Sequence, residues 1–154
     1  MNEEDRAAIA RGIVDQSFYM VLGTADASGR PWAAPVYFAP SGYREFFWVS
    51  SPEATHSRNI AVRPEVGIVI FDSRASIGTG QGVYMRARAE PVEDADLERG
   101  IEIFSRRSQE HGGKPWSVED VQDGIRLYRA TASEYSMLAK DGRPDHRIPV
   151  ELGP

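Results

Sequence analysis

The stretch from Phe46 to Asn59 reads FFWVSSPEATHSRN, and it decides the fold of the chain. Its first half is aromatic and β-branched, which predicts a buried strand. Its second half predicts a helix, because Ser51 is a favourable N-cap and Pro52 suits the first helical position. A strand that turns straight into a helix N-terminus leaves free backbone N–H groups and a partial positive charge at the turn. The stretch therefore predicts an anion-binding site.

The side chains around this turn favour the same kind of ligand. Those with hydroxyl, imidazole, guanidinium or amide groups are Ser50, Ser51, Thr55, His56, Ser57, Arg58 and Asn59. Such groups donate hydrogen bonds to phosphate oxygens, and the bonds are stronger when the donor is ionised. A helix cap with a solvated polar face is the competing interpretation, because short motifs have high false-positive rates.

Strand-like segments lie on both sides of this stretch. Three of them follow one another with turns between them, which predicts a meander of hairpins: 17–25, 31–39 and 43–50. Further strands are predicted at 66–72, 83–92 and 125–132, and residues 133–138 either extend the last one or begin another. A chain of 154 residues fits one domain, 1–154, with one core.

The segment 17–25 is apolar on both of its faces, which is typical of a barrel strand that is covered outside as well as inside. The chain offers few helices for that cover, at 2–15, after Ser51 and after Asp94. We therefore predict that a second copy supplies the cover, in a homodimer. The tail after residue 139 is polar and Pro-rich, which predicts a position on the surface.

The composition excludes several classes of function. A net charge of −5 argues against non-specific binding to nucleic acid or to an anionic membrane. The absence of cysteine excludes disulfides, iron–sulfur clusters and Cys-type zinc sites, and three widely spaced histidines predict no metal site. No apolar run approaches the ~20 residues of a membrane-spanning helix, and the acidic N-terminus is unlike a signal peptide. We therefore expect a cytoplasmic protein.

Four segments, taken in order, resemble one known family. They are LGTADASGRPWAAPVYF (22–38), FWVSSPEATHSRNI (47–60), RPEVGIVIF (63–71) and GQGVYMRARAEPV (80–92). Their order and spacing resemble those of the FMN-binding split β-barrel proteins, the pyridoxamine 5′-phosphate oxidase-like superfamily. The resemblance covers most of residues 17–92, and after residue 93 only a helix and a late strand match.

The resemblance implies a mainly β fold, a six-stranded antiparallel split barrel of Greek-key type with a few flanking helices. It also implies FMN at a two-fold interface of a homodimer. By position, the residues that would flank the isoalloxazine ring with backbone or side-chain atoms are Val36, Tyr37, Trp48 and Val49, with Gln81 at the polar edge of the ring. The residues that would contact the ribityl chain or the phosphate are Ser50, Ser51, His56, Ser57 and Arg58.

Two segments differ from the family pattern. Where the family often has Ser-Arg-Lys, this chain has Ala54-Thr55-His56, so a strong cation pair is reduced to one histidine with Arg58 nearby. If the His56 ring lies beside a phosphate, its pKa should rise above the usual ~6.5. The true oxidase also has a C-terminal Arg-Leu-x-Pro, and Arg147-Ile148-Pro149 matches it poorly, so vitamin B6 oxidation is not expected.

The function implied by the resemblance is an FMN-dependent oxidoreductase that acts on a small molecule, and the sequence singles out no catalytic side chain. One alternative is a reductase that uses the deazaflavin coenzyme, which a surface cluster of Arg86, Arg88, Arg106 and Arg107 would favour. The other alternative is a non-catalytic flavin-binding or haem-binding protein, which the reduced phosphate site favours. Gln81 reads equally well as a residue that forms hydrogen bonds within its own loop.

Overall fold

The computed structural model describes all residues of the chain, 1–154. Its helices are α1 (Glu3–Gln16), α2 (Thr55–Val62) and α3 (Leu97–Glu110), with short 3₁₀ turns at Asp94–Asp96 and Val118–Val121. Its strands are β1 (Tyr19–Ala25), β2 (Pro31–Tyr37), β3 (Ala39–Ser41), β4 (Glu45–Ser50), β5 (Glu65–Phe71), β6 (Gly82–Pro91), β7 (Arg126–Leu138) and β8 (Arg147–Pro149). None of the helices is long and apolar enough to span a bilayer.

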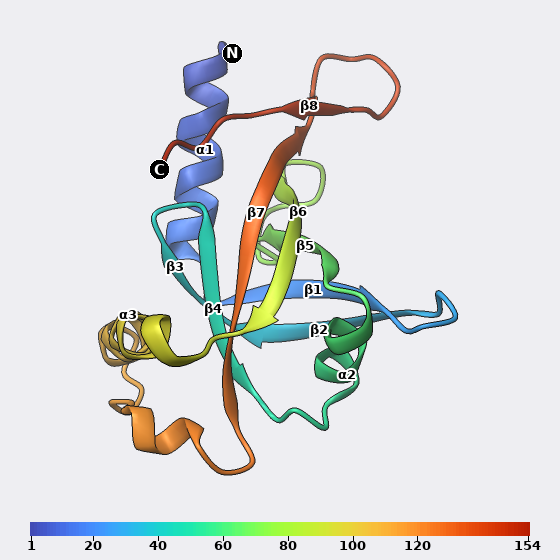
Figure 1. Ribbon diagram of the computed structural model, residues 1–154. Helices are drawn as coiled ribbons and strands as arrows, with labels where there is room; N and C mark the ends of the chain where they lie inside the picture. The colour runs from blue at the N-terminus through green and yellow to red at the C-terminus, as the bar shows by residue number, and fades with distance from the viewer.

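The strands form one antiparallel sheet in the order β2-β1-β5-β6-β7-β4-β3, with β8 added to β7. The sheet curls until the end of β2 approaches β4, without a ladder between them (Figure 1). The expected split-barrel fold is confirmed, with eight strands in place of six. The first hairpin of the expected meander is confirmed as β1–β2, but the second is wrong, because β4 pairs with β3 and β7 and not with β2. Pro31 and Pro35 lack a backbone donor, and β2 accordingly has only β1 as a partner.

A single cluster of buried side chains fills the barrel. It includes inward-facing residues of the strands, such as Leu22 and Ile68, which alternate with outward-facing ones. Helix α1 covers one end with Ala7, Ala10 and Val14, and α2 lies at the other end (Figure 1).

The C-terminal tail belongs to this core, so its expected surface position is wrong. Val150 and Leu152 are each 2% exposed and lie in the barrel cluster. Arg11 of α1 donates a hydrogen bond to the carbonyl of Leu152. Two isolated apolar side chains therefore anchor a segment whose other residues are mostly polar or proline.

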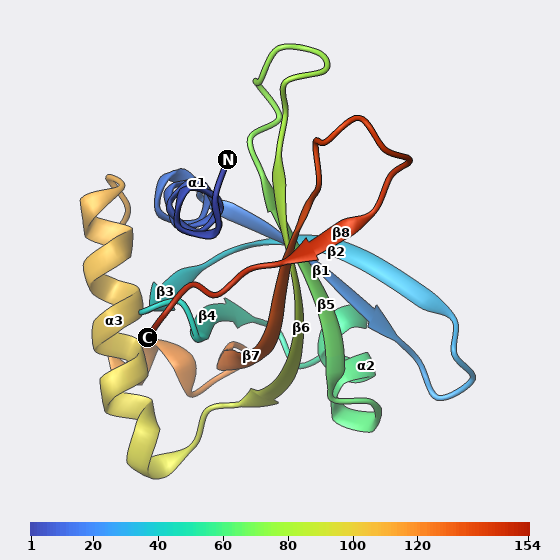
Figure 2. The ribbon, with the colours of Figure 1, turned by 90° about the horizontal axis from the view of Figure 1, so that it is seen from above.

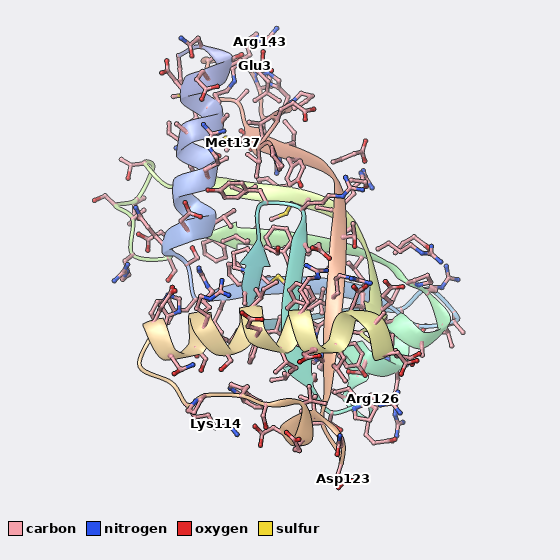
Figure 3. All side chains as sticks on the ribbon, turned by 60° about the vertical axis from the view of Figure 1, so that its left-hand side comes forward. Glu3, Lys114, Asp123, Arg126, Met137 and Arg143 are labelled. Atoms are coloured by element: carbon pink, nitrogen blue, oxygen red, sulfur yellow. The ribbon has the colours of Figure 1, made fainter.

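Helix α3 covers the outer face of β3, β4 and β7 (Figure 3). Its Ile101 and Phe104 pack with the outward-facing Phe47 and Leu127 in a second, smaller cluster. The outer face of β1 and β5 has no such cover, and Tyr19 and Phe71 there are 61% and 48% exposed. Figure 2 shows the β5–β6 and β7–β8 connections extending beyond the sheet.

Candidate functional site

The turn between β4 and α2 is the centre of the candidate site, and the helix begins later than the sequence predicts. Helix α2 starts at Thr55, and its N-cap is Ala54, which has no side chain that could cap it. The Ser51 hydroxyl instead accepts a hydrogen bond from the backbone N–H of Glu53, at 3.1 Å. Ser51 thus stabilises a turn before the helix and not the helix itself. The N–H groups of the first helical turn lack a side-chain acceptor and are available to an anion.

A histidine of α2 contacts the end of β4. The hydroxyl oxygen of Ser50 lies 2.9 Å from Nε2 of His56. The His56 side chain is buried, and its Nδ1 atom makes no hydrogen bond within the chain. Burial lowers the pKa of His56 below the usual value of 6.5. The sequence predicts a raised pKa for His56 beside a phosphate. In the chain alone the pKa is instead lowered, because desolvation favours the neutral ring.

Two further polar residues of α2 are buried. Asn59 donates from Nδ2 to the hydroxyl of Thr24 at 3.0 Å, which ties α2 to β1 inside the barrel. The Ser57 hydroxyl is buried without any hydrogen-bond partner in the chain. An unpartnered buried hydroxyl costs free energy, so Ser57 is a donor that a ligand or a water molecule could satisfy.

Arg58 is not directed to this group. Its guanidinium pairs with the carboxylate of Glu53, and the side chains are 67% and 75% exposed. An exposed pair of this kind contributes little to stability and can open at little cost. Arg58 is thus a nearby cation that a bound anion would have to draw away from Glu53.

The four residues expected at the ring divide between the two faces of the sheet. Val36 and Trp48 lie in the barrel cluster, and Trp48 is fully buried and stacked on Tyr128. Tyr37 and Val49 lie on the other face, against the cluster of α3. Beyond Phe47, β4 has no partner strand on the β3 side, so the backbone at Trp48 and Val49 is open along the split of the barrel.

Tyr37 also contacts a residue that the sequence does not single out. Its hydroxyl lies 2.7 Å from Nδ1 of His111, at the C-terminal end of α3, and Phe18 stacks on the imidazole with ring centres 4.0 Å apart. Burial raises the pKa of Tyr37, while burial and the charge of Arg107 lower the pKa of His111. The two partners are 74 positions apart, so no local pattern predicts the pair.

The Gln81 side chain is engaged within the chain. Its Nε2 donates to the carbonyl of Leu138, and its Oε1 accepts from the N–H groups of Gly82 and Leu138. Gln81 therefore joins the start of β6 to the end of β7, which is the loop role that the sequence left open. Gln81 lies next to the Phe71–Gly82 end of the β5–β6 ladder, and α2 of the same chain lies at the opposite end.

The outer face of the sheet carries a groove of about 690 Å³. Its lining includes the paired glycines Gly23 and Gly67 together with Tyr84, Arg86 and Arg147. The guanidinium of Arg147 stacks on Tyr84, 4.2 Å from the ring centre. The groove combines bare backbone, an aromatic ring and charged side chains of both signs, since Glu134 and Glu151 also line it, and such a lining suits a planar polar ligand.

The four arginines named for a deazaflavin tail do not form one cluster. Arg86 and Arg88 lie on β6 and pair with Glu134 and Glu65. Arg106 pairs with Glu102 on α3. Arg107 donates to backbone carbonyls at the end of α1, at 2.8 Å from that of Ser17, and its pKa is lowered by burial. Each of the four is therefore held by a partner of this chain.

Comparison with known proteins agrees with this fold. The family model described as pyridoxamine 5′-phosphate oxidase matches residues 7–139. No curated protein matches the sequence. Among solved structures, HutZ, the haem storage protein from Vibrio cholerae, is 20% identical with a TM-score of 0.66, and the match covers 86% of this chain and 92% of HutZ.

Two other solved structures have the same fold, and their names mention haem in one case and F420 in the other. A haem-binding protein from Mycobacterium smegmatis is 20% identical with a TM-score of 0.71, and the match covers 93% of this chain but 57% of that protein. An F420 reductase is 15% identical with a TM-score of 0.62, and the match covers 82% and 95% of the two chains. At these identities the likeness establishes the fold alone. Because the family model spans most of the residues and the sheet has the split-barrel form, the chain belongs to the pyridoxamine 5′-phosphate oxidase family.

Proposed function

We propose that this protein is a flavin-dependent oxidoreductase that binds FMN with the phosphate at the N-terminus of α2. The observation that carries the proposal is the uncapped first turn of α2, next to Ser50, His56 and the unpartnered hydroxyl of Ser57. Backbone N–H groups at a helix N-terminus bind phosphate, and the partial charge of the helix adds to the attraction. The donors of this turn fit a phosphate group.

The ring of the flavin would lie along the split between β2 and β4. The Trp48 and Val49 backbone offers unpaired groups there, and Tyr37 offers a partly buried hydroxyl. The side chains of Val36 and Trp48 are part of the core, so they would support the site from behind. Rigid strands on both sides of a cofactor hold it in one orientation.

When bound, FMN would supply the hydride-transfer chemistry, and the protein would bind and orient the cofactor. The residues of this chain bind the phosphate, position the ring edge and exclude water from the split. The groove lined by Tyr84, Arg86 and Arg147 also includes Val21 and Val69, so in a dimer it would lie at the interface and would hold the small-molecule substrate there. The Tyr37 hydroxyl, hydrogen-bonded to His111, can hold a proton near the split.

We further propose that the working form is a homodimer. The outer face of β1 and β5 presents Tyr19, Val21, Val69 and Phe71, and no helix of this chain covers them. Exposed apolar patches of this kind are typical of protein interfaces. A second copy related by two-fold symmetry would bury the same face of both chains.

A non-catalytic carrier of flavin or haem is the second candidate. The observation in its favour is that the anion site holds no free cation, since His56 is buried and Arg58 pairs with Glu53. The separate pairing of Arg86, Arg88 and Arg106 removes the feature that would have favoured the deazaflavin coenzyme.

The visible spectrum of the purified protein, before and after adding FMN, separates these functions. The proposal expects oxidised-flavin absorption bands and their loss when a nicotinamide reductant is added. A Soret band, or a flavin spectrum that no reductant bleaches, would favour the carrier. A colourless protein that leaves added FMN unchanged would contradict both candidates.

A further inference from the structure

We infer that His56 is the specificity-determining residue of the anion site, and that a phosphate group binds there together with one proton, which the imidazole takes up. This inference deepens the proposed function, on which it rests for the identity of the ligand. It concerns a buried histidine at the start of α2, whose charge depends on pH.

The geometry gives His56 one engaged and one free nitrogen. Nε2 lies 2.9 Å from the hydroxyl oxygen of Ser50, whereas Nδ1 has no partner in the chain. A protonated imidazole donates from both nitrogens, so Ser50 would then accept from Nε2. The hydroxyl proton of Ser50 would become available to an anion oxygen, and Nδ1 would supply a second donor. One proton from solvent thereby converts the pair into two donors for a phosphate.

The surrounding charged groups do not donate a proton to His56, and they do not provide a free positive charge in place of the protonated ring. On α2 itself, Arg58 pairs with Glu53, and across the sheet Arg88 pairs with Glu65. At the β1–β2 turn, the Asp26 carboxylate accepts from the N–H groups of residues 28 and 30. None of these groups shifts the pKa of His56, which only burial lowers.

Two unpartnered groups point to an anion as the ligand whose binding makes the ring take up a proton from solvent. The Ser57 hydroxyl is 4% exposed and has no partner, and the first turn of α2 has no cap. An anion beside the ring opposes the effect of burial and favours the charged imidazole. Anion affinity should therefore be highest below the pKa of the free His56, fall by about tenfold per pH unit between the free and the bound pKa, and level off above the bound pKa.

The test follows the His56 ring by NMR between about pH 5 and 9. Spectra are recorded without anion, with inorganic sulfate, whose charge is constant in this range, and with FMN. We expect the His56 titration to move to higher pH by at least one unit when either anion binds. An unchanged His56 titration with both anions would overturn the inference.

Calorimetric FMN titrations in buffers of different ionisation enthalpy count the protons taken up. At a pH between the free and bound titrations, we expect the wild type to take up about one proton more than His56→Lys or His56→Gln, because the ionisation of the FMN phosphate, with a second pKa of about 6, contributes to all three. Arg58→Gln is the matched control and should leave the proton count unchanged. FMN binding with the same proton count in the wild type and in both His56 variants would overturn this inference and leave the proposed function standing. A sulfate-induced shift with no FMN binding would support the anion site and contradict the flavin function.

Discussion

The hydroxyl oxygen of Ser50 lies 2.9 Å from Nε2 of His56, and this contact joins the last residue of β4 to the first turn of α2. The strand end and the helix N-terminus are therefore held together before any ligand is present. Because the histidine is buried, the contact also makes the stability of the fold depend on pH.

The first prediction concerns that dependence. Burial lowers the pKa of His56 in the folded chain, whereas the unfolded chain keeps the usual ~6.5, so the unfolded state binds more protons below about pH 6.5. The free energy of unfolding without ligand should therefore fall as the pH drops below about 6.5. In His56→Gln, whose amide does not titrate, this fall between pH 7 and 5 should be smaller. Urea unfolding at several pH values measures it, and parallel curves for the two proteins would contradict the assignment.

The second prediction uses two glycines of two helices. At Gly100 a Cβ atom would lie 2.7 Å from a methyl carbon of Leu127, so Gly100→Ala should destabilise the fold by about 1–3 kcal/mol. Gly12 in α1 has no atom within 4 Å of such a Cβ, and Gly12→Ala should stabilise by about 0.5–1 kcal/mol. Thermal unfolding of both variants measures the difference. Equal effects would show that α3 does not pack on β7 as described.

The third prediction concerns the proposed dimer. Val69 lies on the uncovered outer face of β5, so Val69→Lys should give a monomer with nearly unchanged secondary structure. Ile77 is fully exposed in the β5–β6 connection, and Ile77→Lys is the matched control that should remain dimeric. Light scattering at micromolar concentration reports the mass. A wild-type monomer would remove the interfacial site, and a dimeric Val69→Lys would place the interface elsewhere.

The fourth prediction separates the two roles of Gln81. Because its amide bonds Leu138 and Gly82, Gln81→Ala should lower the free energy of unfolding by about 1 kcal/mol for each net hydrogen bond lost. FMN affinity, measured well below the unfolding temperature, should change little. A loss of FMN affinity together with a shifted flavin spectrum would instead show that Gln81 contacts the polar edge of the flavin ring.

Six of the eight strands were predictable because each is a local pattern, such as the alternation of Val83 to Ala89 in β6. The three-residue strands β3 and β8 were not predicted, because they are too short to show a pattern. The β1–β2 hairpin was also predictable, but the long-range pairings were not, since β4 pairs with β7 about 80 residues away and no local signal marks that partner. The start of α2 was misplaced because Ser51 can cap a turn as readily as a helix. The buried tail was missed because Val150 and Leu152 are single apolar residues without periodicity.

The candidate site was predictable only where residues are close in sequence. Ser50, His56 and Ser57 lie within eight positions, so a strand–turn–helix pattern places them together. The pairing of Tyr37 with His111 depends on how α3 crosses the sheet, and the engagement of Arg58 by Glu53 depends on the turn geometry. The first pair therefore follows from tertiary structure, and the second from the local shape of the turn before α2.

The most direct test of the account compares the affinities of FMN and riboflavin for the same protein at pH 7. The two ligands differ only in the phosphate, and the account assigns that phosphate to the first turn of α2. It predicts that FMN binds at least about tenfold more tightly than riboflavin, or ~1.4 kcal/mol in binding free energy. Equal affinities, or no binding of FMN, would contradict the phosphate site and with it the proposed flavin function.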